Sequence, residues 1–319
     1  MNKKVRFITL TDILSVLVFV AVIVLLISPI RYSSATLAGV DMFIKNVFPI
    51  LLPFFFLTRL LMELGTVQKL SKGLTGICQK LFGISGIGVF VYVAGVISGY
   101  PTGAKLTGDF YEEGYISSTE AHRMTALVNN SGPMFVIGVV GSGFMLSAKI
   151  GVIILISHIL GAICNGILYR KYEKKDKGKT SLSLTLPPKP RKSGGEILVD
   201  SVLNAWSSIV LVGVYIVLAY LFIEMLLGVT GMQTGIGATM LSGVIEITRG
   251  ALDISQSVTN KWLATVILTA MITFGGISVH LQALAFLSKC KVKYGFFLLT
   301  NITHAFFATA ISCVLALLI

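Results

Sequence analysis

A polar segment with helix-breaking residues, Ser98-Gly-Tyr-Pro-Thr-Gly-Ala-Lys105, directly follows a strongly apolar stretch. Pro101 lacks a backbone N–H donor, and Gly99 and Gly103 permit dihedral angles that other residues avoid. Backbone groups freed at membrane depth need protein partners or a polar cavity. We interpret the segment as the tip of a helical hairpin, the alternative being an ordinary loop between helices. Its candidate binding residues are Ser98, Gly99, Tyr100, Pro101, Thr102, Gly103 and Lys105.

A second segment, Asn129-Asn-Ser-Gly-Pro133, interrupts the apolar run 124–146. Two amides and a hydroxyl before Gly-Pro predict a helix that breaks in mid-membrane. A broken helix offers N–H groups to an anion at one end and carbonyls to a cation at the other. The alternative is a polar contact that only packs two helices together. The candidate residues are Asn129, Asn130, Ser131 and Gly132.

A carboxylate, Glu246, follows the apolar run 235–245. A charge at the bilayer centre costs about 2.5–3.5 kcal/mol, so such a group usually has a partner or lines a polar pathway. Arg249 lies three residues further on, and a structural ion pair is therefore the alternative. The candidate residues are Glu246, Thr248 and Arg249.

The fourth segment, Phe274-Gly-Gly-Ile-Ser-Val-His-Leu-Gln282, places two glycines and three polar side chains in an apolar run. The glycine pair allows the helix to unwind. A lone buried histidine is more often a satisfied structural residue than a proton relay. The candidate residues are Gly275, Gly276, Ser278, His280 and Gln282.

Motifs of enzymes and metal sites are absent from the sequence. It holds no phosphate loop, no H-E-x-x-H, no G-x-S-x-G, and its four cysteines form no C-x-x-C. We therefore expect no enzymatic activity, no catalytic residue, no metal site and no cofactor.

The composition places these segments in a membrane. Of 319 residues, 55% are hydrophobic and 13% are charged, against about 25% charged in soluble domains. This predicts an all-α polytopic membrane protein with about seven to nine segments of roughly 20 residues. Half of the net charge of +12 lies in residues 170–196, where nine Lys/Arg face three Asp/Glu. The positive-inside rule explains this excess, and we expect no nucleic-acid partner.

The basic stretches predict how the apolar runs cross. Lysines and arginines near residues 3–6, 69–80, 170–196 and 289–293 mark four cytoplasmic loops, including the N-terminus. The number of runs between them is odd unless 84–118 and 235–247 enter and leave on the same side. We therefore predict two re-entrant hairpins, from the cytoplasm and from outside respectively.

This topology gives two halves with the same element order and opposite orientation, an inverted repeat typical of secondary transporters. An offset of 144 residues pairs Gly132 with Gly276 and Lys105 with Arg249. We divide the chain into an N-terminal helix and connection (1–44), a first repeat (45–169), a basic cytoplasmic linker (170–200) and a second repeat (201–319).

Four blocks, GYPTGAK, NNSGPMFVIGVVG, GVIEITRG and TFGGISVHLQ, occur in this order. They resemble the YlbJ (SpoVV) family of sporulation integral membrane proteins and, more widely, the nucleoside-recognition or Gate-domain proteins, from about residue 45 to the C-terminus. That group is similar in layout to concentrative nucleoside transporters, with two hairpins and two broken helices around a central site. The resemblance implies transport of dipicolinic acid across the outer forespore membrane during sporulation.

The leading hypothesis is therefore a transporter of a small organic anion, with dipicolinate as the named cargo. Lys105, Arg249 and the amides of Asn129 and Asn130 would recognise carboxylates, and Glu246 would serve coupling or gating. A nucleoside or base carrier and a non-transporting membrane scaffold in spore maturation remain open. Expected partners are the anion and the lipid bilayer; a coupling ion, H+ or Na+, and a homo-oligomer are left open.

Overall fold

The computed structural model describes residues 10–172, 192–231 and 236–319. The structure is 87% helical, and the described residues form no strand, which confirms the all-α prediction. Among the described residues, five helices are long and apolar enough to cross a membrane, or six if the bent pair α4–α5 counts as one span. The sequence predicts more spans because several of its apolar runs are divided into shorter helices, as described below.

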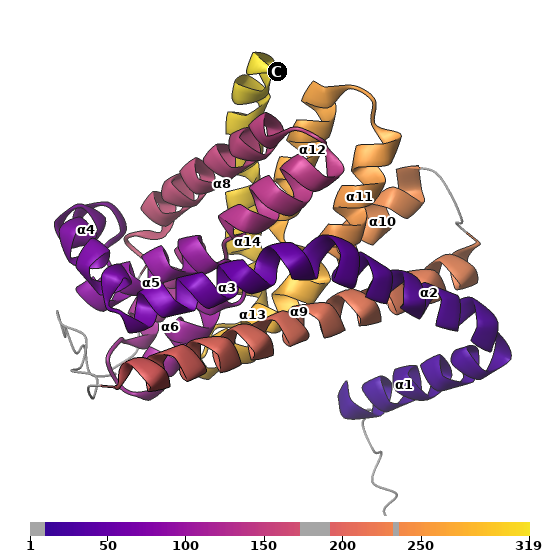
Figure 1. Ribbon diagram of the computed structural model, residues 1–319, viewed down its shortest axis with the longest axis horizontal. Helices are drawn as coiled ribbons and strands as arrows, with labels where there is room; N and C mark the ends of the chain where they lie inside the picture. The colour runs from indigo at the N-terminus through magenta and orange to yellow at the C-terminus, as the bar shows by residue number, and fades with distance from the viewer. Residues whose placement is uncertain (1–9, 173–191, 232–235) are drawn as a thin grey trace, which may run out of the picture.

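Two very long helical segments lie side by side across the molecule (Figure 1). The first runs from Pro29 to Glu63 through α2 (Pro29–Met42), a π-helical turn η1 (Phe43–Val47) and α3 (Phe48–Glu63). The second is α9 (Gly194–Thr230). The two segments can approach closely because Gly39 on α2 has no side chain; a Cβ there would lie 3.0 Å from the Val217 Cα on α9. We call these segments the long-helix pair.

The start of the chain is more helical than the sequence indicates. Helix α1 (Leu10–Ile27) ends before Ser28, and α2 begins at Pro29, which suits the first turn of a helix because its missing N–H is not needed there. The segment from residue 31 to residue 44, where we expected a connection, continues as helix. Ser33 and Ser34 direct their hydroxyls back to the Ile30 carbonyl and so interrupt no backbone bond.

A helical hairpin lies where the sequence predicts the first one. After α4 (Thr66–Phe82) the chain bends by 101° into α5 (Gly86–Ser98), and α6 (Thr102–Glu112) returns beside it. The two helices can approach closely because Gly95 has no side chain; a Cβ there would lie 3.1 Å from the Gly103 Cα. We call residues 99–101 the first tip.

The predicted break in the next helix is also present. Helix α7 (Ser118–Val128) stops before residues 129–132, and the π-helix η2 (Met134–Phe144) follows. We call residues 129–132 the first break. The chain then forms α8 (Ala148–Tyr169), which ends the first half.

The second half also contains a hairpin and an interrupted helix after α9, without a counterpart of α4 among its described residues. Helices α10 (Ile236–Ile245) and α11 (Ile247–Ser257) form a hairpin whose only non-helical residue is Glu246, the second tip. This hairpin extends ten residues beyond the 235–247 that we predicted. Gly243 and Gly250 sit backbone to backbone near its tip.

The apolar run 262–287 is interrupted at Gly275, where the glycine pair was expected to allow unwinding. Helix α12 (Lys261–Phe274) ends there in a left-handed conformation with φ +95°, and α13 (Gly276–Leu287) begins. We call Gly275 the second break. After η3 (Ser288–Cys290), helix α14 (Tyr294–Leu315) and η4 (Ala316–Leu318) complete the chain.

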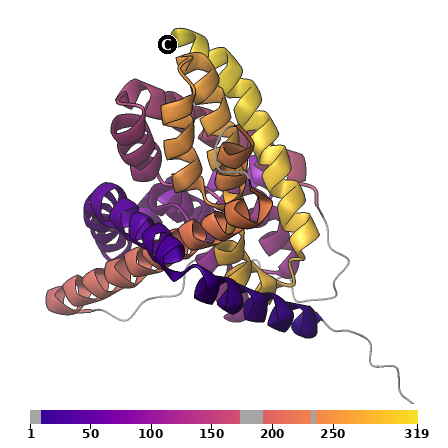
Figure 2. The same cartoon turned by 90° about the vertical axis from the view of Figure 1, so that its right-hand side faces the viewer.

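The two halves meet along their last helices. Helix α14 packs against both α8 and α12 and runs along one flank of the bundle in Figure 2. One buried apolar cluster surrounds α5 and α7, and another joins α3, η2, α9, α11 and α12. The tips and breaks lie between these packed regions, which fix their positions.

Candidate solute-binding cavity

A cavity lies where both hairpin tips and the first break meet α13 and the long-helix pair. It has about 60 Å³ of space for water centres, enough for a few water molecules. Its lining residues at the tips, the first break and α13 that are polar or glycine, with Tyr100, are Ser98, Gly99, Tyr100, Ser131, Gly132, Glu246, Thr248, Ser278 and Gln282. The other lining residues are Leu51, Phe54, Phe55, Met134, Phe135, Val212, Tyr215, Ile216, Ile247 and Val279. The lining thus combines aromatic rings with hydrogen-bonding groups.

The first tip and the first break touch through their backbones. Gly99 has φ +75° and ψ −168°, a conformation available essentially only to glycine. A Cβ built on Gly99 would lie 2.5 Å from the Gly132 backbone nitrogen. This wall of the cavity therefore requires glycine at position 99.

Glu246 is the only acid or base, tyrosines apart, among the cavity-lining residues. Its carboxylate caps α11, accepting from the Arg249 backbone N–H at 2.7 Å and the Thr248 hydroxyl at 3.0 Å. A carboxylate at this place is stabilised by the N-terminal end of the helix. The alternative ion pair with Arg249 is not formed, because the Arg249 Nε contacts Asp253 at 3.1 Å.

Nine of the predicted residues line the cavity, and ten do not. The ten are Pro101, Thr102, Gly103, Lys105, Asn129, Asn130, Arg249, Gly275, Gly276 and His280. Lys105 is exposed on α6, and the Arg249 guanidinium lies over the Tyr220 ring, 4.9 Å from its centroid. No lysine or arginine therefore lines the cavity as the structure describes it.

The two asparagines of the first break are buried behind the cavity. The Asn129 amide donates to the Asn301 side chain at 2.6 Å, and the Asn130 amide donates to the Leu127 carbonyl. They hold the broken helix against α14 and against its own last turn. The Asn129 contact matches the packing alternative considered from the sequence, whereas Asn130 bonds only within its own segment.

The aromatic wall was not found by sequence reasoning. Phe54, Phe55, Phe135 and Tyr215 lie in apolar runs whose other members face lipid or the core. A helix that is apolar on every side gives no signal for the side that faces a cavity. Tyr100 could be singled out because it stands between a glycine and a proline.

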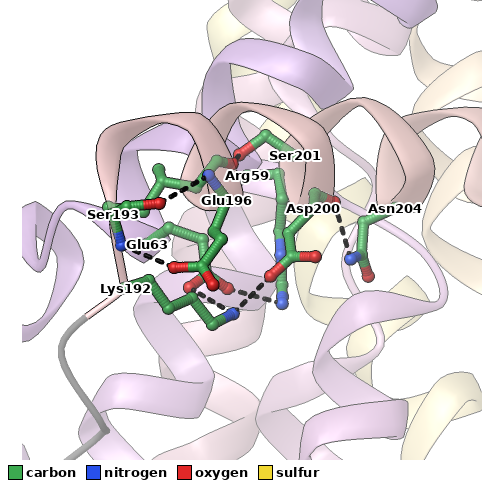
Figure 3. Close-up of polar contacts among 9 residues, drawn as sticks. Arg59, Glu63, Lys192, Ser193, Glu196, Asp200, Ser201 and Asn204 are labelled. Atoms are coloured by element: carbon green, nitrogen blue, oxygen red, sulfur yellow. Dashed lines mark hydrogen bonds and ion pairs between the residues drawn. The ribbon is translucent and has the colours of Figure 1, made fainter.

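Ion pairs fasten the long-helix pair at both ends. At one end Glu63, on α3, contacts Arg59 at 2.7 Å and Lys192 at 3.3 Å, and Lys192 also contacts Asp200 at 2.6 Å (Figure 3). At the other end Arg31 contacts Glu224 at 2.8 Å.

The cluster in Figure 3 also fixes the start of α9. Ser193 accepts from the Glu196 N–H, and Glu196 accepts from the Ser193 N–H at 2.7 Å, a reciprocal capping box. Lys192 thus joins this cap to α3 and links the two members of the long-helix pair at this end.

The fold defines a polytopic α-helical membrane protein with a small polar cavity at its helix breaks. Comparison with known proteins shows which membrane proteins the chain resembles. Residues 44–163, from η1 to α8, match the Gate family model, described as nucleoside recognition. The chain is also 29% identical over 305 residues to the sporulation integral membrane protein YlbJ of Bacillus subtilis (strain 168).

That alignment covers 86% of this chain and 75% of YlbJ. The resemblance expected from the sequence blocks is therefore confirmed: part of the first half matches the Gate model, and most of the chain is similar to YlbJ. No solved structure matches the chain.

Proposed function

We propose that the chain is a membrane transporter that binds a small aromatic solute in this cavity. The observation that carries the proposal is the convergence of two hairpin tips and a broken helix on one cavity inside an apolar bundle. Discontinuous helices of this kind form the substrate sites of many secondary transporters. A solute would bind between these elements and the long-helix pair.

The transport hypothesis includes an inverted repeat, as the sequence predicts. It is supported by the shared order of a long helix, a hairpin, a broken helix and a final helix in both halves. The inverted arrangement requires the two hairpins to enter the membrane from opposite sides, the first from the cytoplasm and the second from outside. The N-terminus then lies in the cytoplasm.

Cysteine accessibility at Tyr111 and Thr230, in a background without native cysteines, tests this topology. A membrane-impermeant maleimide should label Tyr111→Cys from the cytoplasmic side and Thr230→Cys from outside. Labelling of both from the same side contradicts the inverted repeat.

The proposed cargo is dipicolinic acid, moved across the outer forespore membrane during sporulation. Its flat ring suits the rings of Phe54, Phe55 and Tyr215, and its carboxylates suit the hydroxyls of the lining residues Ser98, Ser131 and Ser278. The cavity must widen before a ring enters, because it now holds only a few waters.

A nucleoside or base is the second candidate. Glu246 and Gln282 favour it, because together they offer acceptors and donors to a neutral heterocycle without a cationic partner. The description of the matched family model as nucleoside recognition points the same way.

Ligand-dependent thermal stabilisation of the purified protein separates these candidates. Dipicolinate should raise the unfolding temperature, and uridine and adenosine should not; the reverse result would identify the second candidate. Neither solute should act on a non-transporting scaffold. Vesicle uptake of the solute that binds then tests transport itself.

Two variants locate the binding site. Gln282→Ala removes a cavity-lining amide and should weaken binding. Lys105→Ala, on the exposed side of α6, is the matched control and should leave binding unchanged. A loss of binding in Lys105→Ala alone would show that the anion site lies elsewhere.

A further inference from the structure

A fully buried histidine on α8 connects the two halves behind the cavity. The His158 Nε2 accepts from the Ser131 backbone N–H at 3.1 Å, and its Nδ1 lies 2.9 Å from the Thr273 hydroxyl. Ser131 belongs to the first break and lines the cavity. Thr273 lies two residues before the second break. One imidazole ring thus bridges the two points where helices are interrupted.

The geometry fixes the form of this imidazole. A backbone N–H can only donate, so the His158 Nε2 carries no proton. The ring proton therefore sits on Nδ1, which donates to the Thr273 oxygen. Only the neutral ring with this tautomer makes both bonds. The other titratable group facing the ring is His304 on α14, at 4.7 Å between ring centroids.

Carbonyl groups in the last turn of α12 accept further hydrogen bonds from side chains near the cavity. The Tyr100 hydroxyl, from the first tip, donates to the Ile272 carbonyl at 2.9 Å. The His280 Nε2 contacts the Phe274 carbonyl at 2.8 Å. The last carbonyls of a helix have no partner within it, and these side chains supply partners. Residues 272–274 therefore hold the first tip, α8 and α13 in one arrangement.

We propose that His158 is a positioning residue that sets the distance between the two helix breaks and, through Ser131, the shape of the cavity. As long as the bridge is intact, a displacement of one break is transmitted to the other. His158 does not line the cavity and acts through Ser131 and Thr273. The effect on solute binding rests on the proposed function, whereas the bridge itself does not.

Hydrogen–deuterium exchange without any solute tests the bridge. His158→Leu should raise the exchange rate of the Ser131 amide about tenfold, the equivalent of one hydrogen bond. His158→Gln should stay near the original rate, because a carboxamide also presents an acceptor and a donor. Thr273→Val gives a second route if His158→Leu does not fold: loss of the Nδ1 partner should speed exchange at Ser131.

His304→Leu is the matched control, since it removes an equally buried ring whose Nε2 contacts the His158 carbonyl at 2.9 Å and neither break. Equal exchange at Ser131 in all variants, or an equal rise in His304→Leu, would overturn the proposal. Dipicolinate and uridine titrations then follow. If exchange at Ser131 rises only in His158→Leu and Thr273→Val, and neither solute binds the protein, the bridge is supported and the proposed function is refuted.

Solute binding that is weaker in His158→Leu and restored in His158→Gln, with equal unfolding temperatures of the two variants, supports both the bridge and the proposed function. A purely structural role would instead lower the unfolding temperature and leave the affinity of the folded protein unchanged.

Discussion

Replacing Gly99 by alanine places a methyl group between the first tip and the first break. The backbone at this position has φ +75° and ψ −168°, which costs a residue with a Cβ about 1–3 kcal/mol. The Cβ would also lie 2.5 Å from the Gly132 nitrogen and 2.8 Å from its Cα, against an ordinary contact of at least 3.4 Å. The tip and the break must therefore separate by about 0.9 Å, and overpacking of this kind costs about 1–3 kcal/mol.

The expected total is a destabilisation of about 2–6 kcal/mol, lower if the tip swings away. Swinging relieves the overlap but opens the cavity wall, so solute affinity should fall even where stability recovers. Thermal unfolding in detergent and a solute titration measure the two effects on the same sample.

Gly76→Ala is the control for the same chemical change. No atom lies within 4 Å of its Cβ, and it sits on the exposed side of α4. Alanine there should stabilise the helix by up to about 1 kcal/mol. If Gly99→Ala matched this control in both stability and binding, the backbone contact between tip and break would not shape the cavity.

Other substitutions address single contacts. Glu246→Ala removes the cap of α11 and should cost about 0.5–2 kcal/mol, whereas Glu246→Gln keeps an acceptor and should lose transport with less loss of stability; equal stability loss in both would contradict the cap. Glu63→Ala should destabilise more than Arg31→Ala, because the Glu63 side chain is 2% exposed and the Arg31 side chain 36%. A double-mutant cycle of Asn129→Ala and Asn301→Ala, followed by thermal unfolding, should show a coupling of about 0.5–1.5 kcal/mol; additive effects would exclude their bond.

Helix breakers made much of this architecture predictable. Pro101 with its flanking glycines, the Gly-Pro after Ser131, and the pair at Gly275 each interrupt a helix in the structure. Glycine and proline act through the backbone of their own segment, so a single sequence is enough to place them.

The roles of the charged residues were less predictable. Arg249 lies close to Glu246 in sequence, yet a one-turn step along α11 brings it to Asp253, and Glu246 faces the other way as a cap. Lys105 lies one turn beyond the first tip, but on the face of α6 that points away from the cavity. Which face of a short helix is inside depends on packing partners distant in the chain.

His158 shows the same limit more sharply. It stands in a mostly apolar helix that its three glycines do not interrupt, and its partners are 27 and 115 residues away. Only the packing of α8 against the first break and α12 reveals it.

The length of the long-helix pair has a consequence for the lipid around it. Helices of 35 and 37 residues are roughly 50–55 Å long, while the hydrocarbon layer is about 30 Å thick. Such helices match the layer only by leaning far from the bilayer normal, and a thinner layer demands a larger lean. Because Phe54, Phe55 and Tyr215 are carried on this pair, bilayer thickness would change the angle at which one wall meets the tips. Lipid chain length then becomes a physical variable of the binding site.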